Sequence, residues 1–333
     1  MPVSRMSNRH AISFWKGKPM HTMLIRLPLI CILASLALFD CASAAGRSAR
    51  NGAMRGLYIP NRHANSIEYI RSVMERGRPL GINMVVLDVH PFGAHRTRIS
   101  RDVLDYLKGR GVYTAGRIAC FQDGLKSLPV PDEYIKRLFG VIEETAGAGF
   151  DEVQLDYIRF PDGAPYYALS SKYGFVDDLL RKARLITKER GVKLSADLFG
   201  RVVYNRDDII GQKVENFARH VEVIYPMLYP SHFTGDKYRL ANPGETVRDG
   251  TNRGIARVRG TGVRIQPYIQ AFPYNIQWAR VPLDKYVEVQ IVAAESTEAR
   301  GWVAWNAKGE YDCVFRALEG LKNGSRKDIA SAR

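Results

Sequence analysis

Runs of residues with the pattern of β-strands alternate with runs that have the pattern of helices along nearly the whole chain. The eight strand-type runs cover residues 54–60, 84–90, 113–119, 152–160, 193–200, 222–229, 264–271 and 301–307. Eight amphipathic, helix-type runs follow them in turn, at residues 66–76, 101–109, 131–146, 175–190, 212–219, 245–258, 283–299 and 311–321. This alternation predicts the α/β class and a single (β/α)8 TIM barrel, a fold of about 250 residues.

The connections between these runs differ in length on the two sides of each strand. Glycines end several helix-type runs just before the next strand, as at Gly109, Gly149, Gly191 and Gly301, so these connections are short. The longer connections follow strands, at residues 92–100, 121–130, 161–174 and 231–244. In such a barrel the connections after the strands form the face that binds substrate, and we expect the functional site there.

The longest apolar run lies near the beginning of the chain, at residues 27–39. Lys16, Lys18 and Arg26 precede it and the small residues 42–44 follow it, which is the order found in a secretory signal peptide. The run is shorter than the ~20 residues that a stable membrane span requires. We therefore expect cleavage after residue 44, a secreted or periplasmic protein, and no membrane span in the mature chain.

With this leader the chain divides into three parts: a signal peptide at residues 1–44, one barrel domain at 45–322 and a polar tail at 323–333. A lipid anchor is not expected, because Asp40 before Cys41 is a poor match to a lipoprotein signal. After cleavage, Cys120 and Cys313 are the two cysteines that remain of the four in the chain. So few cysteines exclude a scaffold built on disulfides.

The chain is basic, with 49 Lys and Arg against 34 Asp and Glu and a net charge of +15. These cations are spread over the helix-type runs and form neither a basic stripe nor a known nucleic-acid motif, so nucleic acid is not an expected partner. They are interpreted as solvated helix faces. Affinity for an acidic polysaccharide is the alternative interpretation.

Polar residues alternate with apolar ones toward the ends of several strand-type runs. Asp88 and His90 do so in the second run, Gln154 and Asp156 in the fourth, and Asp197 in the fifth. Because helices cover the outside of a barrel, the polar set should face the barrel axis. The apolar set, which by the same alternation includes Tyr157, should face the helices.

Further polar and aromatic residues are expected to line the same pocket as substrate-binding groups. They are Arg117, Arg159, Tyr225, Tyr229, Tyr268 and Trp305, together with Asp88, His90 and Gln154. Aromatic rings offer flat apolar faces with hydrogen-bonding edges, a combination that suits sugar rings.

Two carboxylates on neighbouring strands indicate the chemistry. Strands lie about 4.8 Å apart, so Asp156 and Asp197 at matching heights would approach the ~5–5.5 Å separation of retaining glycosidases. Asp156 would then be the nucleophile, oriented by Arg117, and Asp197 the general acid/base. A longer separation, or Asp88 or a loop acid as the partner, would favour inversion with an activated water.

Other interpretations remain open. Asp156 in a buried ion pair with Arg117 or Arg159 would be structural. The barrel would then bind glycans without cleaving them. Convergence of Asp88, His90 and Asp156 on a metal would favour metal-assisted deacylation of a polysaccharide, although the chain contains no closely spaced ligand motif. We expect neither a metal nor another cofactor.

Four of these runs resemble the putative glycosyl hydrolase domain family of bacterial secreted proteins: residues 150–161 (FDEVQLDYIRFP), 113–123 (YTAGRIACFQD), 195–200 (SADLFG) and 225–232 (YPMLYPSH). The resemblance spans nearly the whole mature chain. It implies a TIM barrel related to the α-amylase-like glycosidases, acting as a glycoside hydrolase on a polysaccharide or oligosaccharide. The chain departs from the α-amylase pattern at Gln154, where that pattern has an arginine, and at Asp197, where it has a glutamate.

Overall fold

The computed structural model describes residues 53–90, 98–121, 124–163, 165–299 and 301–331. The expected signal peptide at residues 1–44 lies outside these ranges. Within them, no helix is both long enough and apolar enough to cross a membrane.

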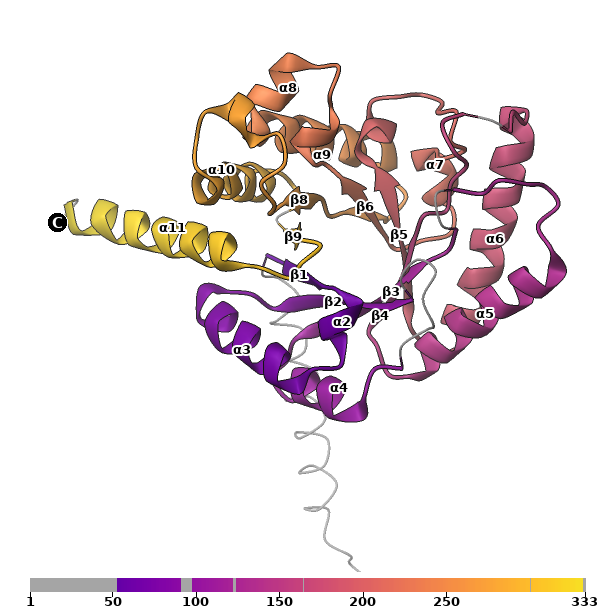
Figure 1. Ribbon diagram of the computed structural model, residues 1–333, viewed down its shortest axis with the longest axis horizontal. Helices are drawn as coiled ribbons and strands as arrows, with labels where there is room; N and C mark the ends of the chain where they lie inside the picture. The colour runs from indigo at the N-terminus through magenta and orange to yellow at the C-terminus, as the bar shows by residue number, and fades with distance from the viewer. Residues whose placement is uncertain (1–52, 91–97, 122–123, 164, 300, 332–333) are drawn as a thin grey trace, which may run out of the picture. The chain divides into compact units, whose positions relative to one another are not determined.

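Nine parallel strands pair into one closed sheet (Figure 1). They are β1 (Arg55–Ile59), β2 (Met84–His90), β3 (Tyr113–Ala119), β4 (Glu152–Asp156), β5 (Lys193–Phe199), β6 (Val223–Met227), β7 (Arg264–Ile265), β8 (Tyr268–Gln270) and β9 (Trp302–Trp305). Each strand pairs with the next along the chain from β1 to β6, and β9 pairs with β1 to close the ring. Strands β7 and β8 both pair with β6 and together fill the seventh barrel position. Pro267 lies between β7 and β8. Because it has no backbone N–H to donate, it interrupts the strand at this point. The predicted (β/α)8 barrel is confirmed.

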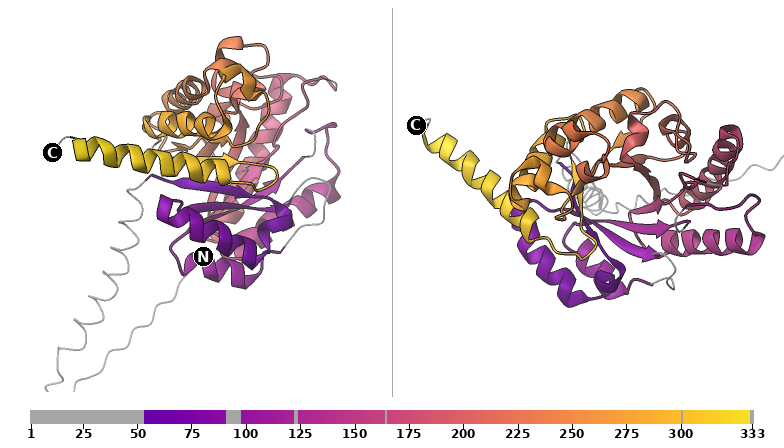
Figure 2. Two further views of the ribbon diagram at one scale, coloured as in Figure 1. Left: turned by 60° about the vertical axis from the view of Figure 1, so that its left-hand side comes forward. Right: turned by 45° about the horizontal axis from the view of Figure 1, so that its top comes forward.

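Helices surround the strands on the outside (Figure 2). They are α2 (Asn61–Ala64), α3 (Ile67–Gly77), α4 (Arg101–Lys108), α5 (Asp132–Gly147), α6 (Leu169–Glu189), α7 (Val214–Phe217), α8 (Lys237–Ala241), α9 (Pro243–Val258), α10 (Leu283–Glu295) and α11 (Asp312–Ser331). Short 3₁₀ turns lie at η1 (Arg78–Leu80), η2 (Gly200–Val203), η3 (Pro230–His232) and η4 (Ile276–Ala279). The last helix extends beyond residue 321, where the sequence pattern ends it.

Local sequence accounts for the boundaries of several helices. Ser66 and Ser100 cap the N-termini of α3 and α4, since each hydroxyl accepts a hydrogen bond from the backbone N–H three residues later. Gly149 follows α5 with a φ of 101°, a left-handed conformation that glycine adopts without a steric penalty. The short connections from helix to strand therefore follow from the capping residues, as the sequence predicts.

Alternate side chains of each strand belong to two different cores. Val85 and Leu87 of β2 face the helices, while Met84 and Val86 face the inside of the barrel. All four are fully buried, and burial of a side chain of this size stabilises the fold by roughly 1.5–3 kcal/mol. The same alternation continues as far as Asp88 and directs it toward the barrel axis, and the register shifts between Asp88 and His90.

The register of the strands places the polar residues in levels along the axis. Arg117 of β3 is opposite Gln154 of β4, and Gln154 is opposite Ser195 of β5. Asp156 and Asp197 each lie two residues further along, so they occupy the same level near the C-terminal ends of the strands. The equal height expected from the sequence is therefore present.

Candidate active site

A cavity of about 560 Å³ opens at the C-terminal ends of the strands. Arg117, Asp156 and Asp197 lie at its floor, and most of its remaining lining is aromatic: Tyr157, Phe199, Tyr229, His232, Phe233, Tyr268, Phe272, Tyr274 and Trp305. Its volume lies within the ~300–1,000 Å³ that small-molecule sites occupy. Six of the predicted site residues line it, namely Asp156, Asp197, Arg117, Tyr229, Tyr268 and Trp305.

Arg117 holds two carboxylates at the floor of this cavity. Its Nη1 donates to Oδ1 of Asp88 at 2.6 Å, and its Nη2 and Nε both donate to Oδ2 of Asp156, at 2.6 and 3.1 Å. All three side chains are buried. Buried ions require partners that satisfy their charge and hydrogen-bonding capacity, and here one guanidinium serves both acids.

The backbone just after Asp156 completes the contacts of this carboxylate. Tyr157 N donates to Asp156 Oδ1 at 2.6 Å, so both carboxylate oxygens accept hydrogen bonds. Tyr157 has a φ of 56°, which is uncommon for a residue with a bulky side chain and is found where the surroundings enforce it. This reversal ends β4 at Asp156, four residues earlier than predicted. It also turns Tyr157 into the cavity, so the expectation that Tyr157 faces the helices is wrong.

Asp197 is the third carboxyl group of the cluster, and its contacts are fewer. Its Oδ2 is 3.9 Å from Arg117 Nε, and its Oδ1 has no hydrogen-bond partner among the described residues. Burial, and next the negative charge of Asp156, raise the pKa of Asp197 well above its usual range. With one cation shared among three acids, Asp197 is the acid that keeps its proton.

Asp88 is anchored from a second side. Tyr58 of β1 donates its hydroxyl to Asp88 Oδ2 at 3.0 Å, and burial raises the pKa of Tyr58, which keeps that hydroxyl protonated. Asp88 lies beneath Arg117 and does not line the cavity. Tyr58 is not among the residues predicted for the site. Strand alternation in residues 54–60 could have identified it as an inward-facing residue.

Other predicted residues lie outside the cavity. Gln154 is fully buried one level below the floor, where its Oε1 accepts from Tyr268 at 2.8 Å. Tyr225 is opposite Asp197 in the strand register, but its hydroxyl donates deeper in the barrel, to Glu152 at 2.9 Å. Arg159 stacks over Phe199 at 4.5 Å behind the cavity wall. His90 ends β2, and its buried Nδ1 has no hydrogen-bond partner among the described residues.

A further buried acid, which is not among the predicted site residues, is located deeper in the barrel. Glu152 is fully buried and accepts hydrogen bonds from Ser195, Tyr113 and Tyr225. Burial raises the pKa of Glu152, although these three hydroxyl groups act in the opposite direction. It lies four residues before Asp156 on the same face of β4, too deep to reach the cavity.

The metal-binding alternative required Asp88, His90 and Asp156 to converge. In the described part of the chain, no group of three or more His, Cys, Asp or Glu side chains is arranged to hold a metal ion. The guanidinium of Arg117 instead lies between Asp88 and Asp156 and bonds to both. The positive charge that these two acids require is supplied by the protein itself.

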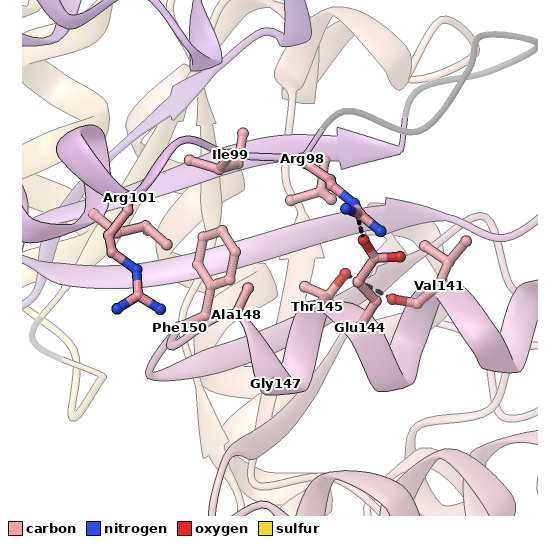
Figure 3. Close-up of a pocket in the computed structure, with 11 residues that line it drawn as sticks. Arg98, Ile99, Arg101, Val141, Glu144, Thr145, Gly147, Ala148 and Phe150 are labelled. Carbon is pink, nitrogen blue, oxygen red and sulfur yellow. Dashed lines mark hydrogen bonds and ion pairs between the residues drawn. The ribbon is translucent and has the colours of Figure 1, made fainter.

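A second hollow, of about 540 Å³, lies on the outer side of the barrel between α4 and α5 (Figure 3). Among its described lining residues the one carboxylate is Glu144, which pairs with Arg98. Ile99 and Phe150 form its apolar part. It lacks a second acid, and the cavity at the strand ends is the better candidate for an active site.

A known family matches the chain. Residues 132–311 match the model of a family described as "Putative glycosyl hydrolase domain", and they make up more than half of the chain. The chain belongs to this family. The matched residues of this glycosyl hydrolase domain include β4, β5 and both Asp156 and Asp197. No curated protein matches the chain.

Solved structures show the same fold. The glycoside hydrolase domain of PgaB (BpsB) from Bordetella bronchiseptica is 14% identical, with a TM-score of 0.60 over 80% of this chain and 98% of that one. The GH5_18 protein from Streptomyces cattleya in complex with GlcNAc is 14% identical, with a TM-score of 0.58 over 81% and 80%. A chitinase from Chromobacterium violaceum is 12% identical, with a TM-score of 0.56 over 80% and 98%.

The departure from the α-amylase pattern at Gln154 now has a structural explanation. That pattern supplies an arginine two residues before its strand-four carboxylate, and here the corresponding position is a buried glutamine. The guanidinium beside Asp156 comes from Arg117 on the neighbouring strand instead.

Proposed function

We propose that this glycosyl hydrolase domain cleaves glycosidic bonds of a polysaccharide, with Asp197 as proton donor and Asp156 as the carboxylate that faces the reacting carbon. The observation that carries the proposal is the unequal environment of the two adjacent acids. Arg117 neutralises Asp156, whereas Asp197 is buried with a raised pKa and a free Oδ1. Pairs of carboxyl groups whose environments separate their proton affinities are typical of acid/base catalysis.

The reaction follows from this distribution of charge. Asp197 gives its proton to the glycosidic oxygen as the bond from that oxygen to the anomeric carbon breaks. Asp156 stabilises the positive charge that develops on the sugar, or bonds covalently to the anomeric carbon in a retaining reaction. Water then adds to the anomeric carbon, the bond from that carbon to Asp156 breaks where one has formed, and Asp197 takes up a proton of that water, which restores the protein.

The free protein requires one rearrangement before this reaction. A proton donor must lie within hydrogen-bond reach of the glycosidic oxygen, whereas Oδ2 of Asp197 is 3.9 Å from Arg117 Nε at the floor of the cavity. Asp156 is fixed by Arg117 and the backbone of Tyr157, but Asp197 has no partner at Oδ1. We infer that Asp197 rotates away from Asp156 toward the glycosidic oxygen when substrate enters.

The sugars to test first are suggested by the structural neighbours. One neighbour is a chitinase and another was solved in complex with GlcNAc. Amino-sugar polymers are therefore the first candidates within the polysaccharide class. We further propose that the mature protein acts outside the cytoplasm, on the basis of the leader at residues 1–44.

A second candidate function is glycan binding without cleavage. The observation in its favour is that three N–H donors, two from Arg117 and one from Tyr157, already occupy the oxygens of Asp156. A buried carboxylate whose two oxygens already accept these hydrogen bonds is also what a purely structural ion pair would contain. The two functions differ in whether bound glycan is cut.

A hydrolysis screen against a glycan library distinguishes them. The wild-type protein is compared with Asp156→Asn and Asp197→Asn, and Glu319→Gln on the exposed surface of α11 serves as the control. Cleavage by the wild type and the control that is lost in both Asn variants supports hydrolysis. Undiminished turnover by Asp156→Asn contradicts the proposed mechanism, and binding with no cleavage by any protein supports the second candidate.

A further inference from the structure

A continuous series of aromatic rings leads from the floor of the cavity to its rim. Trp305 lies 5.8 Å from Tyr58 and 5.3 Å from Phe272, measured between ring centroids. The centroid of His232 lies 6.2 Å from that of Phe272 and 6.3 Å from that of Tyr274. Exposure rises along this series, from 6% at Tyr58 to 55% at Tyr274.

Two more exposed aromatic side chains follow on the same two loops, four residues after Tyr274 and six residues after His232. Trp278, on the turn η4, is 43% exposed, and Tyr238, on the short helix α8, is 64% exposed. The helix α8 follows β6 and η4 follows β8, so both belong to the face that carries the cavity, and they pack against each other. Large aromatic side chains gathered at the mouth of a cavity mark a binding surface more often than isolated exposed ones.

Buried amides hold these two loops in place. The side-chain Nε2 of Gln270 donates to the carbonyls of Phe272 and Tyr274, at 3.0 and 2.8 Å, and its Oε1 accepts from Ser231 N at 3.1 Å. Asn275 Nδ2 donates to the carbonyl of Ser231 at 3.4 Å. Gln270 thus ties the loop after β8 to the loop after β6 and fixes the aromatic rings before any ligand arrives.

The backbone around Trp278 is strained as well. Asn275 and Arg280, which bracket η4, both have a φ of 55°. Left-handed conformations in residues other than glycine cost free energy and persist where the surrounding structure imposes them, often at ligand-binding sites. Here the surrounding structure holds a turn that leaves Trp278 43% exposed.

The charges of the cavity indicate the chemistry of the ligand. Arg117 and Arg201 are the arginines among its described lining residues, and both are already paired, Arg201 with Asp208 at 3.0 Å. An anionic sugar would meet the carboxyl groups of Asp156 and Asp197 without an unpaired cation to balance it. The cavity therefore suits an uncharged sugar.

We propose that Trp305, Phe272, His232, Tyr274, Trp278 and Tyr238 form an aromatic track that binds a neutral pyranose chain longer than the cavity. The proposal rests on the proposed function only in taking a glycan as the ligand of the cavity. Sugar rings beyond the cavity would stack on Trp278 and Tyr238, which follow Tyr274 at the rim. Affinity should consequently increase with chain length.

Calorimetric titration with hexasaccharides and disaccharides of three neutral series, N-acetylated chitin, cellulose and β-mannan, tests this proposal. Hyaluronan oligosaccharides serve as the anionic probe. All titrations use the Asp197→Asn protein, so that the ligands stay intact.

At least one neutral hexasaccharide should bind tenfold or more tightly than its disaccharide. Trp278→Ala or Tyr274→Ala should reduce that ratio of affinities about tenfold, which corresponds to ~1.4 kcal/mol. Tyr274→Phe retains the ring and should retain the ratio, as should Tyr166→Ala, which removes an exposed ring outside the track.

Three results would overturn the proposal: equal affinity for hexasaccharide and disaccharide in every neutral series, tighter binding of hyaluronan than of any neutral chain, or an unchanged ratio in both alanine variants. Hydrolysis assays on the wild-type protein separate this outcome from failure of the proposed function. Length-dependent binding without cleavage leaves the aromatic track supported and contradicts the hydrolase. Cleavage without length-dependent binding supports the hydrolase and contradicts the aromatic track.

Discussion

Asp156 and Asp197 project at the same level from adjacent strands of the barrel, with Oδ2 of Asp156 3.1 Å and Oδ2 of Asp197 3.9 Å from Nε of the same arginine, Arg117. Two buried acids so placed are not both ionised without a large penalty, because their like charges repel each other. Arg117 donates two hydrogen bonds to Asp156 and reaches Asp197 only at 3.9 Å. The position of one guanidinium therefore determines which acid holds the proton.

Replacement of Asp197 by Asn tests the role of that proton. The amide has nearly the same shape but cannot transfer a proton to the leaving oxygen, so kcat should fall by about 10²- to 10⁴-fold. The measurement is kcat on a glycan that the wild-type protein cleaves. Thermal unfolding serves as the control, because a variant that is inactive through misfolding would unfold at a lower temperature. Wild-type kcat in Asp197→Asn would assign the proton donor to another residue.

The raised pKa of Asp197 also predicts how stability depends on pH. Above its ordinary pKa of 3.8 the unfolded chain releases this proton, whereas the folded protein retains it because of burial and the charge of Asp156. The folded state then binds more protons, so the free energy of unfolding falls as pH rises from about 4 through the folded pKa, by at most ~1.4 kcal/mol per pH unit.

Asp197→Asn should remove this loss, so its stability relative to the wild type should grow as the pH is raised from about 4. Chemical denaturation at several pH values measures the difference. Glu152 has a pKa raised in the same direction by burial, so Glu152 contributes a similar slope in both proteins and does not affect the comparison. Parallel stability curves for wild type and variant would contradict the assignment of the proton to Asp197.

Arg117→Met should be strongly destabilising, because it leaves Asp88 and Asp156 buried without a cation. Breaking a buried ion pair by removing one partner typically costs about 3–5 kcal/mol. Urea denaturation should show this loss, and adding Asp88→Asn and Asp156→Asn to Arg117→Met should restore much of it. Arg190→Met, which breaks an exposed pair with Glu143, is the matched control and should cost at most ~1 kcal/mol. Equal denaturation midpoints for Arg117→Met and Arg190→Met would contradict this account.

The sequence predicts the barrel and the direction of its inward side chains because both follow from short-range periodicity. Alternation with a period of two places Asp88, Arg117, Asp156 and Asp197 on the inner face without any tertiary information. The same rule also selects Gln154 and Tyr225, which do face inward. Neither lines the cavity: Gln154 lies two residues before Asp156 on β4, and the hydroxyl of Tyr225 bonds to the deeper Glu152. Alternation gives the face of a side chain but not its depth.

The positions of residues on the connecting loops do not follow from strand alternation. Phe272, His232 and Tyr274 reach the cavity because Gln270 bonds to two backbone carbonyls and to the facing loop, and all of these contacts are tertiary. Tyr157 is the clearest example, since no local pattern distinguishes a tyrosine that continues a strand from one that reverses it. Its φ of 56° is imposed by the surrounding structure.

That conformation makes Tyr157 a test of strain at the site. Glycine adopts a φ of 56° without the steric cost that any other residue incurs, so Tyr157→Gly should be more stable than Tyr157→Ala by about 1 kcal/mol, although both lose the same ring. At an ordinary helical position the order is reversed, and the exposed helical Lys182 supplies that control through Lys182→Gly and Lys182→Ala. Urea denaturation of the four variants measures both differences. If Tyr157→Ala proved more stable than Tyr157→Gly, as expected at Lys182, the turn after Asp156 would carry no backbone strain. Contacts of the tyrosine ring would then have to account for the direction of Tyr157 into the cavity.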